Sequence, residues 1–112
     1  MLEAFGQAFS LEDDVTLIIK TFDNPHNTIS ESLTAWQKKN PDFPQVVIIK
    51  EDLDEGSLKS IYEQCDVLVA PSCAEGFGLP IAEAMLSGMP AIVTDWSGQK
   101  DFCDSTNSWL VD

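Results

Sequence analysis

The feature that most constrains this fold is a glycine loop at residues 75–78, which separates a short apolar run from a helical segment. The apolar run, at residues 66–72, ends in proline and serine and is typical of a strand buried on both faces. Pro80 stands near the start of the next segment, and Gly88 and Pro90 stand at its end, which are signals that start and stop a helix. The sequence therefore predicts a strand, a tight loop and a helix in direct succession.

A loop of this kind offers the chemistry of anion binding. Gly76 and Gly78 let a ligand approach the main chain closely. The amides of the first helical turn, with Leu79 as a donor, carry partial positive charge and suit a phosphate. Glu75 on the loop and Glu83 one turn into the helix are acceptors, so their natural partners are sugar hydroxyls. The alternatives without a binding role are that Glu75 is a solvated loop carboxylate and that Glu83 is a first-turn acid favoured by the helix dipole.

Strand and helix patterns alternate along the rest of the chain. This alternation is typical of a Rossmann-like, doubly wound α/β domain, with a mostly parallel sheet in the middle of three layers and ligands beyond the carboxyl ends of the strands. A chain of 112 residues makes one domain at most, here residues 1–112. We expect strands at 15–22, 46–49, 91–94 and 109–111, and helices at 2–9, 28–40 and 58–65, the last capped by Ser57.

Composition narrows the class of partner. The net charge is −13, from 19 acidic residues against six lysines and no arginine, which argues against nucleic acid and anionic membranes as partners. No apolar stretch approaches the roughly 18 residues of a membrane span, and no basic-then-apolar leader opens the chain. Three cysteines without paired spacing predict reduced thiols rather than a metal site. We therefore expect a cytoplasmic protein.

Residues 71–93, Pro-Ser-Cys-Ala-Glu-Gly-Phe-Gly-Leu-Pro-Ile-Ala-Glu-Ala-Met-Leu-Ser-Gly-Met-Pro-Ala-Ile-Val, resemble the signature of the retaining, GT-B-fold glycosyltransferases of group 1 (family 4). Seven residues separate its two glutamates, Glu75 and Glu83. The resemblance extends over residues 1–112 as a pattern and is most specific over 58–98. It implies the carboxyl-terminal, donor-binding half of such an enzyme, which holds a nucleoside diphosphate sugar for transfer to an acceptor.

The resemblance also implies roles for individual residues. Glu75 would be the catalytic residue, contacting the donor sugar and stabilising charge as the glycosidic bond breaks, and Glu83 would bind the ribose. The diphosphate would lie on the backbone of the loop and first turn, and Lys50 and Leu53 would flank the base. The expected donor-binding residues are therefore Ser72, as a phosphate contact or helix cap, with Gly76, Phe77, Gly78, Leu79, Glu83, Lys50 and Leu53.

A second, weaker motif follows the strand expected at 91–94. Ser97 and Gly98, followed by Asp101, resemble the family's glycine pair and glutamate, with serine and aspartate in place of one glycine and of the glutamate.

The resemblance implies neither a cofactor nor a bound metal. It also implies an amino-terminal acceptor domain and a first strand that this chain lacks, so we expect no turnover by this piece alone. In the full-length enzyme we expect a place in the cytoplasm or at the inner face of the membrane. The missing strand would lie between the strands at 15–22 and 67–70. We predict that these two strands pair directly, or that a second copy fills the gap and makes a homodimer.

Two other functions remain open on the sequence. The first is a non-catalytic nucleotide-binding or interaction module with the same fold, which would bind nucleotide weakly without transferring sugar. The second is a dinucleotide-binding domain. Against the second, no Gly-x-Gly-x-x-Gly motif follows the first strand, and Gly76-Phe77-Gly78 lacks the third glycine. The base, the sugar and the acceptor are left open.

Overall fold

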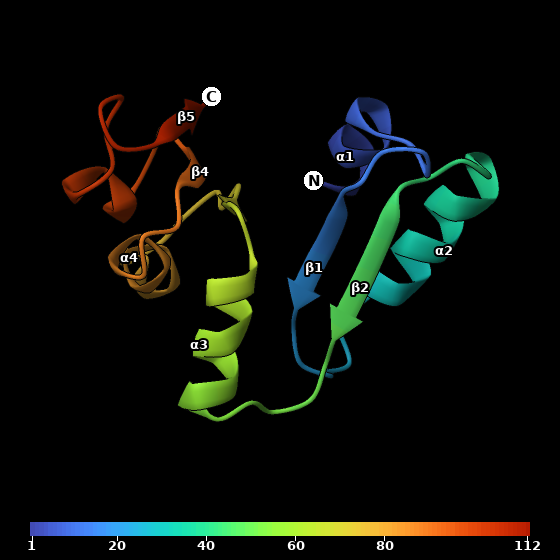
Figure 1. Ribbon diagram of the computed structural model, residues 1–112, viewed down its shortest axis with the longest axis horizontal. Coiled ribbons are helices and arrows are strands. Elements are labelled where there is room, and N and C mark those ends of the chain that lie inside the picture. Colours follow the sequence, from blue (N-terminus) through green and yellow to red (C-terminus); the bar gives the residue numbers. More distant parts are fainter. The chain divides into compact units, whose positions relative to one another are not determined.

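The computed structural model describes residues 1–112, which form two compact units, Met1–Asp52 and Leu53–Asp112. Helices and strands alternate in both units (Figure 1). None of the helices combines the length and the hydrophobicity needed to cross a bilayer. The first unit contains α1 (Leu2–Ala8), β1 (Thr16–Lys20), α2 (Ile29–Lys39) and β2 (Gln45–Ile49). The second contains α3 (Glu55–Gln64), β3 (Leu68–Ala70), α4 (Leu79–Leu86), β4 (Ala91–Thr94), the 3₁₀ helix η1 (Gly98–Asp101) and β5 (Trp109–Val111).

In the first unit, β1 and β2 form a parallel pair in which Leu17 lies opposite Val46. Parallel neighbours need a crossover connection, and α2 supplies it alongside the two strands (Figure 1). Side chains alternate along β1, so that Leu17 and Ile19 are half-buried while Ile18 is exposed. The sheet therefore has one covered face and one face open to solvent.

The first unit buries Leu2 of α1 together with Phe43 and Pro44, which lead into β2. A glycine in mid-helix costs about 0.5–1 kcal/mol relative to alanine. Gly6 is nevertheless required in α1, because a Cβ atom there would lie 2.8 Å from one carbon of the Phe43 ring. Close packing of this ring fixes α1 against the segment before β2.

In the second unit, three parallel strands lie in the order β3-β4-β5. The buried core consists of Ile81 from α4, Ala91 and Val93 from β4, and Cys103. Half-buried residues pack around this core: Leu68, Ala70, Met85, Phe102 and Leu110. Helix α4 is thereby fixed on one face of the sheet.

The strand predicted at 66–72 is shorter than expected, and the prediction that both of its faces are buried is wrong. Leu68 and Ala70 pack against the core, but the side chains of Val67 and Val69 are 39% and 37% exposed. The reason is that successive side chains of a strand point to opposite faces, and only one set reaches the core cluster.

The predicted α/β class with parallel strands is confirmed, because every strand pair in the structure is parallel. The direct pairing predicted between β1 and β3 is not tested, because these two strands belong to different units. The alternative, in which a second copy fills the gap, stays a prediction.

The prediction that Ser57 caps the third helix is also wrong. Helix α3 begins three residues earlier than expected, at Glu55, and its N-cap is Asp54, whose carboxylate accepts a 2.7 Å hydrogen bond from the Ser57 main-chain N–H. An aspartate three residues before the bonded amide has the ideal cap spacing. Ser57 therefore donates its amide to the cap, and the side chain that accepts is that of Asp54.

Replacing the cap should weaken α3 in a pH-dependent way. The Ser57 backbone hydrogen bond holds the pKa of Asp54 below its ordinary range. A lowered folded-state pKa means that the cap stabilises the fold above the unfolded pKa and loses its effect as pH falls through the folded value. We expect Asp54→Ala to lower the thermal unfolding midpoint at pH 7, and the difference from wild type to shrink in acid. Ser60→Ala is the matched control, because Ser60 is exposed on α3 and its hydroxyl forms no hydrogen bond, and this variant should not lower the midpoint. Circular dichroism melts measure both variants.

Candidate functional site

The candidate site lies on the loop at residues 71–78, the β3–α4 loop, which leads from the carboxyl end of β3 into α4. Ligands of open parallel sheets bind beyond the carboxyl ends of the strands. Gly78 is the N-cap of α4 and has φ 87° and ψ 49°, in the left-handed region that favours glycine. The local sequence thus turns the chain sharply from strand into helix, as predicted.

The amino-terminal end of α4 leaves a group of main-chain amides free. The N–H groups of residues 76–79 and of Ile81 donate to no acceptor in the protein, and Pro80 has none. The first helical bond is the one from the Ala82 N–H to the Gly78 carbonyl, at 3.0 Å. No side chain caps this helix. Free amides at the positive end of a helix dipole are suited to a phosphate group.

The two acidic residues flank these amides in the chain. Glu75 is half-buried on the loop, and Glu83 is exposed on α4. Neither carboxylate forms a hydrogen bond or ion pair with a protein group, so both remain free to accept hydrogen bonds from a ligand. Burial raises the pKa of Tyr62 on α3, and the charge of Glu83 adds to this effect.

The main chain of Glu75 is held by the turn that follows β4. Its N–H donates to the Ser97 hydroxyl oxygen at 3.0 Å, and the same hydroxyl donates to the Glu75 carbonyl at 2.8 Å. The Gly98 N–H donates to this carbonyl as well, at 3.3 Å. One serine side chain therefore satisfies both main-chain polar groups of the expected catalytic residue.

Gly98 is required where these two segments meet. A Cβ atom on Gly98 would lie 2.9 Å from the Glu75 carbonyl oxygen and would overlap the Gly76 carbonyl. Ser97 has φ 73° and ψ −161°, a region that is populated essentially by glycine. The resemblance of Ser97 and Gly98 to a glycine pair, weak in sequence, thus matches the backbone conformation of Ser97 and the lack of space for a side chain at Gly98.

Residues after this turn support the rest of the loop. The Phe77 and Phe102 rings have centroids 4.9 Å apart at an interplanar angle of 40°. Gln99 lies beside Gly78, is fully buried, and donates from Nε2 to the Thr94 carbonyl at 3.0 Å. Its Oε1 atom has no hydrogen-bond partner. Sequence reasoning missed Gln99, because a glutamine beside a charged pair in a short turn predicts a solvated side chain.

Ser72 lies in the same loop and is half-buried. Its hydroxyl forms no hydrogen bond with the protein, and the N-cap of α4 is Gly78, so Ser72 does not cap the helix. Its predicted contact with phosphate is untested.

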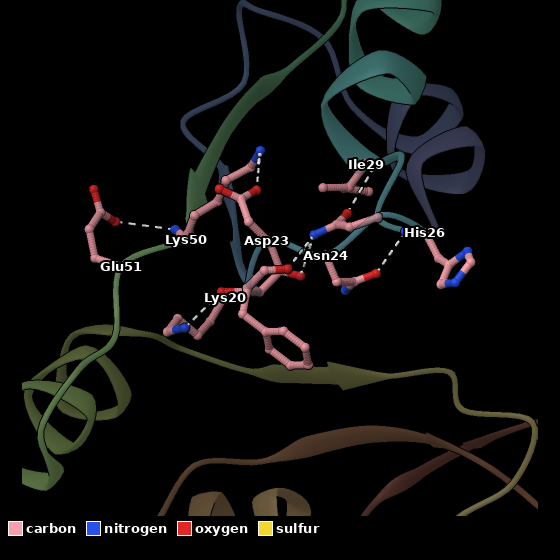
Figure 2. A network of polar contacts seen from close by, with 10 residues as sticks. Lys20, Asp23, Asn24, His26, Ile29, Lys50 and Glu51 are labelled. Atoms are coloured by element: carbon pink, nitrogen blue, oxygen red, sulfur yellow. Dashed lines mark hydrogen bonds and ion pairs between the residues drawn. The ribbon is translucent and has the colours of Figure 1, made fainter.

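The structure does not bring Lys50 together with the loop residues within one unit. Lys50 follows β2 in the first unit, and its ammonium group forms a 2.9 Å ion pair with Asp23, which raises the Lys50 pKa. Figure 2 shows this pair at the carboxyl ends of β1 and β2, beside the hydrogen bond from the Lys50 main-chain N–H to the Glu51 carboxylate. Leu53 is half-buried and begins the second unit. The predicted base pocket stays a prediction.

A shallow apolar hollow is found at the opposite edge of the second sheet. It is lined by Asp66, Val67, Pro90, Ile92 and Trp109, at or near the amino-terminal ends of the three strands. Ligands of parallel sheets bind at the other edge, where the β3–α4 loop lies.

The comparisons with known proteins support the family resemblance seen in the sequence. A family model for group 1 glycosyl transferases matches residues 1–112. The chain is also similar to the O-antigen chain mannosyltransferase RfbU of Salmonella typhimurium (strain LT2), with 43% identity over 49 residues. That match covers 44% of this chain and 14% of the relative's length. No solved structure matches the chain.

Substituting Gly98 should test the close approach of the two turns. We expect Gly98→Ala to lower the free energy of unfolding by about 1–3 kcal/mol, because the added methyl group is forced against the Gly76 carbonyl. The matched control is Gly56→Ala in α3, where the nearest atom would be 3.5 Å away, and it should be neutral or up to about 1 kcal/mol more stable. Urea unfolding followed by tryptophan fluorescence measures both. Equal stability of the two variants would contradict this packing.

Proposed function

The chain belongs to the group 1 glycosyltransferases, and from this membership we propose that it forms the donor-binding part of a retaining enzyme of the GT-B fold. The proposed donor is a nucleoside diphosphate sugar. The observation that carries the proposal is the row of unpaired amides at residues 76–79, with two uncommitted carboxylates on the same loop and helix. Neither a cofactor nor a metal ion is needed for this proposal.

The proposed phosphate site is electrostatic. The amides of residues 76–79 and the dipole of α4 would stabilise the diphosphate, and most strongly when it gains charge as the leaving group. The lysines of the second unit do not add a free cation, because Lys59 pairs with Glu63 and Lys100 pairs with Asp95. In this proposal, hydrogen bonds from the main chain therefore contribute most of the binding free energy of the diphosphate.

The two glutamates take different parts of the donor. Glu83 would accept hydrogen bonds from the ribose hydroxyls, and Glu75 would accept them from the sugar that is transferred. Contact with the reacting sugar makes Glu75 the proposed catalytic residue, which stabilises positive charge as the glycosidic bond breaks. Ser72 would contact phosphate, and Lys50 and Leu53 would flank the base.

The relative's name suggests a sugar and a pathway. Because the similar Salmonella protein is a mannosyltransferase of O-antigen chains, we propose mannose as the transferred sugar and polysaccharide synthesis as the setting. We further propose that the acceptor is bound by a second, amino-terminal domain and that the enzyme works in the cytoplasm or at the inner face of the membrane.

One observation favours the alternative of a non-catalytic nucleotide-binding module. Both lysines of the second unit are paired with carboxylates, so a diphosphate meets no unpaired cation there. Weak binding of nucleoside diphosphates, with the same affinity whether or not a sugar is attached, would support this alternative.

Calorimetric titration with nucleoside diphosphates and with their mannose and glucose esters tests the proposal. We expect Glu83→Ala to weaken binding of both ligand types by about 1–3 kcal/mol, because both carry the ribose. Glu75→Ala should weaken binding of the sugar esters more than that of the free diphosphates. Glu55→Ala is the control, because Glu55 is exposed on α3 and forms no ion pair, and this variant should bind both ligand types normally. If the wild-type chain binds no member of the panel, the proposed function is wrong.

A further inference from the structure

We propose that Ser97 is a positioning residue for sugar recognition, which acts by fixing the main chain of Glu75. This inference rests on the proposed function, because the ligand reached by Glu75 is the donor sugar. Ser97 itself makes no contact with the sugar. It sets where the Glu75 carboxylate can reach, through the two hydrogen bonds between its hydroxyl and the Glu75 main chain.

The first argument is that Glu75 has no other main-chain anchor. Its N–H bonds only to the Ser97 hydroxyl, and its carbonyl bonds only to Ser97 and to the Gly98 N–H. A residue that precedes the helix and lies outside the β3 ladder has no secondary structure to hold it. The position of Glu75 therefore depends on the turn that follows β4, 22 residues further along the chain.

The second argument is the backbone conformation of Ser97. With φ 73° and ψ −161°, Ser97 occupies a region that disfavours any residue with a Cβ atom, and glycine would adopt it freely. A serine at this position is strained, and the structure shows what the hydroxyl contributes there. It both accepts from and donates to Glu75, which glycine cannot do.

The third argument separates Glu75 from the phosphate site. The amides of residues 76–79 are not bonded to Ser97, and the end of this segment is supported elsewhere, by Phe102 against Phe77 and by Gln99 beside Gly78. Loss of the Ser97 hydroxyl should therefore release Glu75 and leave the amides close to their places. The effect should appear in recognition of the sugar rather than of the diphosphate.

Two substitutions of Ser97 separate the effect of its hydroxyl group from the effect of its strained backbone conformation. Ser97→Ala removes the hydroxyl and keeps the strained Cβ atom, whereas Ser97→Gly removes both. In both variants we expect the ratio of the affinity for the sugar ester to the affinity for the free nucleoside diphosphate to fall about fivefold to tenfold. We also expect the Glu75 amide to exchange with deuterium about tenfold faster in both, as measured by NMR. Ser105→Ala, an exposed serine without hydrogen bonds in the same unit, is the control and should change neither quantity.

Several results would overturn the inference. If Ser97→Gly keeps wild-type discrimination for the sugar and wild-type amide exchange, the hydroxyl has no positioning role. Equal losses of affinity for both ligand types would assign Ser97 to the phosphate site instead. If Ser97→Ala does not fold, Ser97→Gly alone decides, because it carries no strain. If the wild-type chain binds no ligand, the proposed function fails, and exchange of the Glu75 amide still shows whether Ser97 holds that residue.

Discussion

The candidate site depends on one contact, the meeting of the Glu75–Gly76 main chain with the Ser97–Gly98 turn. The chain comes so close to itself there that Gly98 has no room for a side chain. Three hydrogen bonds join the two segments, and all of them involve the main chain of Glu75. Core packing of α4 through Ile81 brings the helix to the sheet, but it does not by itself orient the loop in front of the helix. The three hydrogen bonds at this contact orient the loop.

A strongly acidic chain that is proposed to bind a polyanion must solve an electrostatic problem. The net charge of −13 repels a diphosphate at long range, although salt screens this repulsion beyond roughly 8–10 Å. At short range the free amides of residues 76–79 are fixed dipoles that need no counterion and no reorganisation. Such a site favours a ligand that comes close to the main chain, and the lack of a side chain at Gly76 would allow this approach.

Much of the fold could be predicted, because the signals that start and end helices and that favour strands depend only on residues close together in the chain. Pro80 and Gly88 marked the helix that became α4, and β-branched residues marked β1 and β2. The cap of α3 could not be predicted, since Asp54 and Ser57 are both cap-forming residues and only the structure shows which side chain accepts the bond. The exposure of Val69 could not be predicted, because it depends on how many faces of the sheet are covered.

The site itself was predictable in part. The loop and its glycines follow from the sequence, as do the two glutamates of the motif. The role of Ser97 does not, because its hydrogen bonds join residues far apart in the chain and a serine gives no sign of a left-handed conformation. These bonds also have a consequence for protein engineering. A graft of residues 71–86 alone into another scaffold would leave the main chain of Glu75 without partners, so the smallest transferable cassette runs from β3 through Cys103.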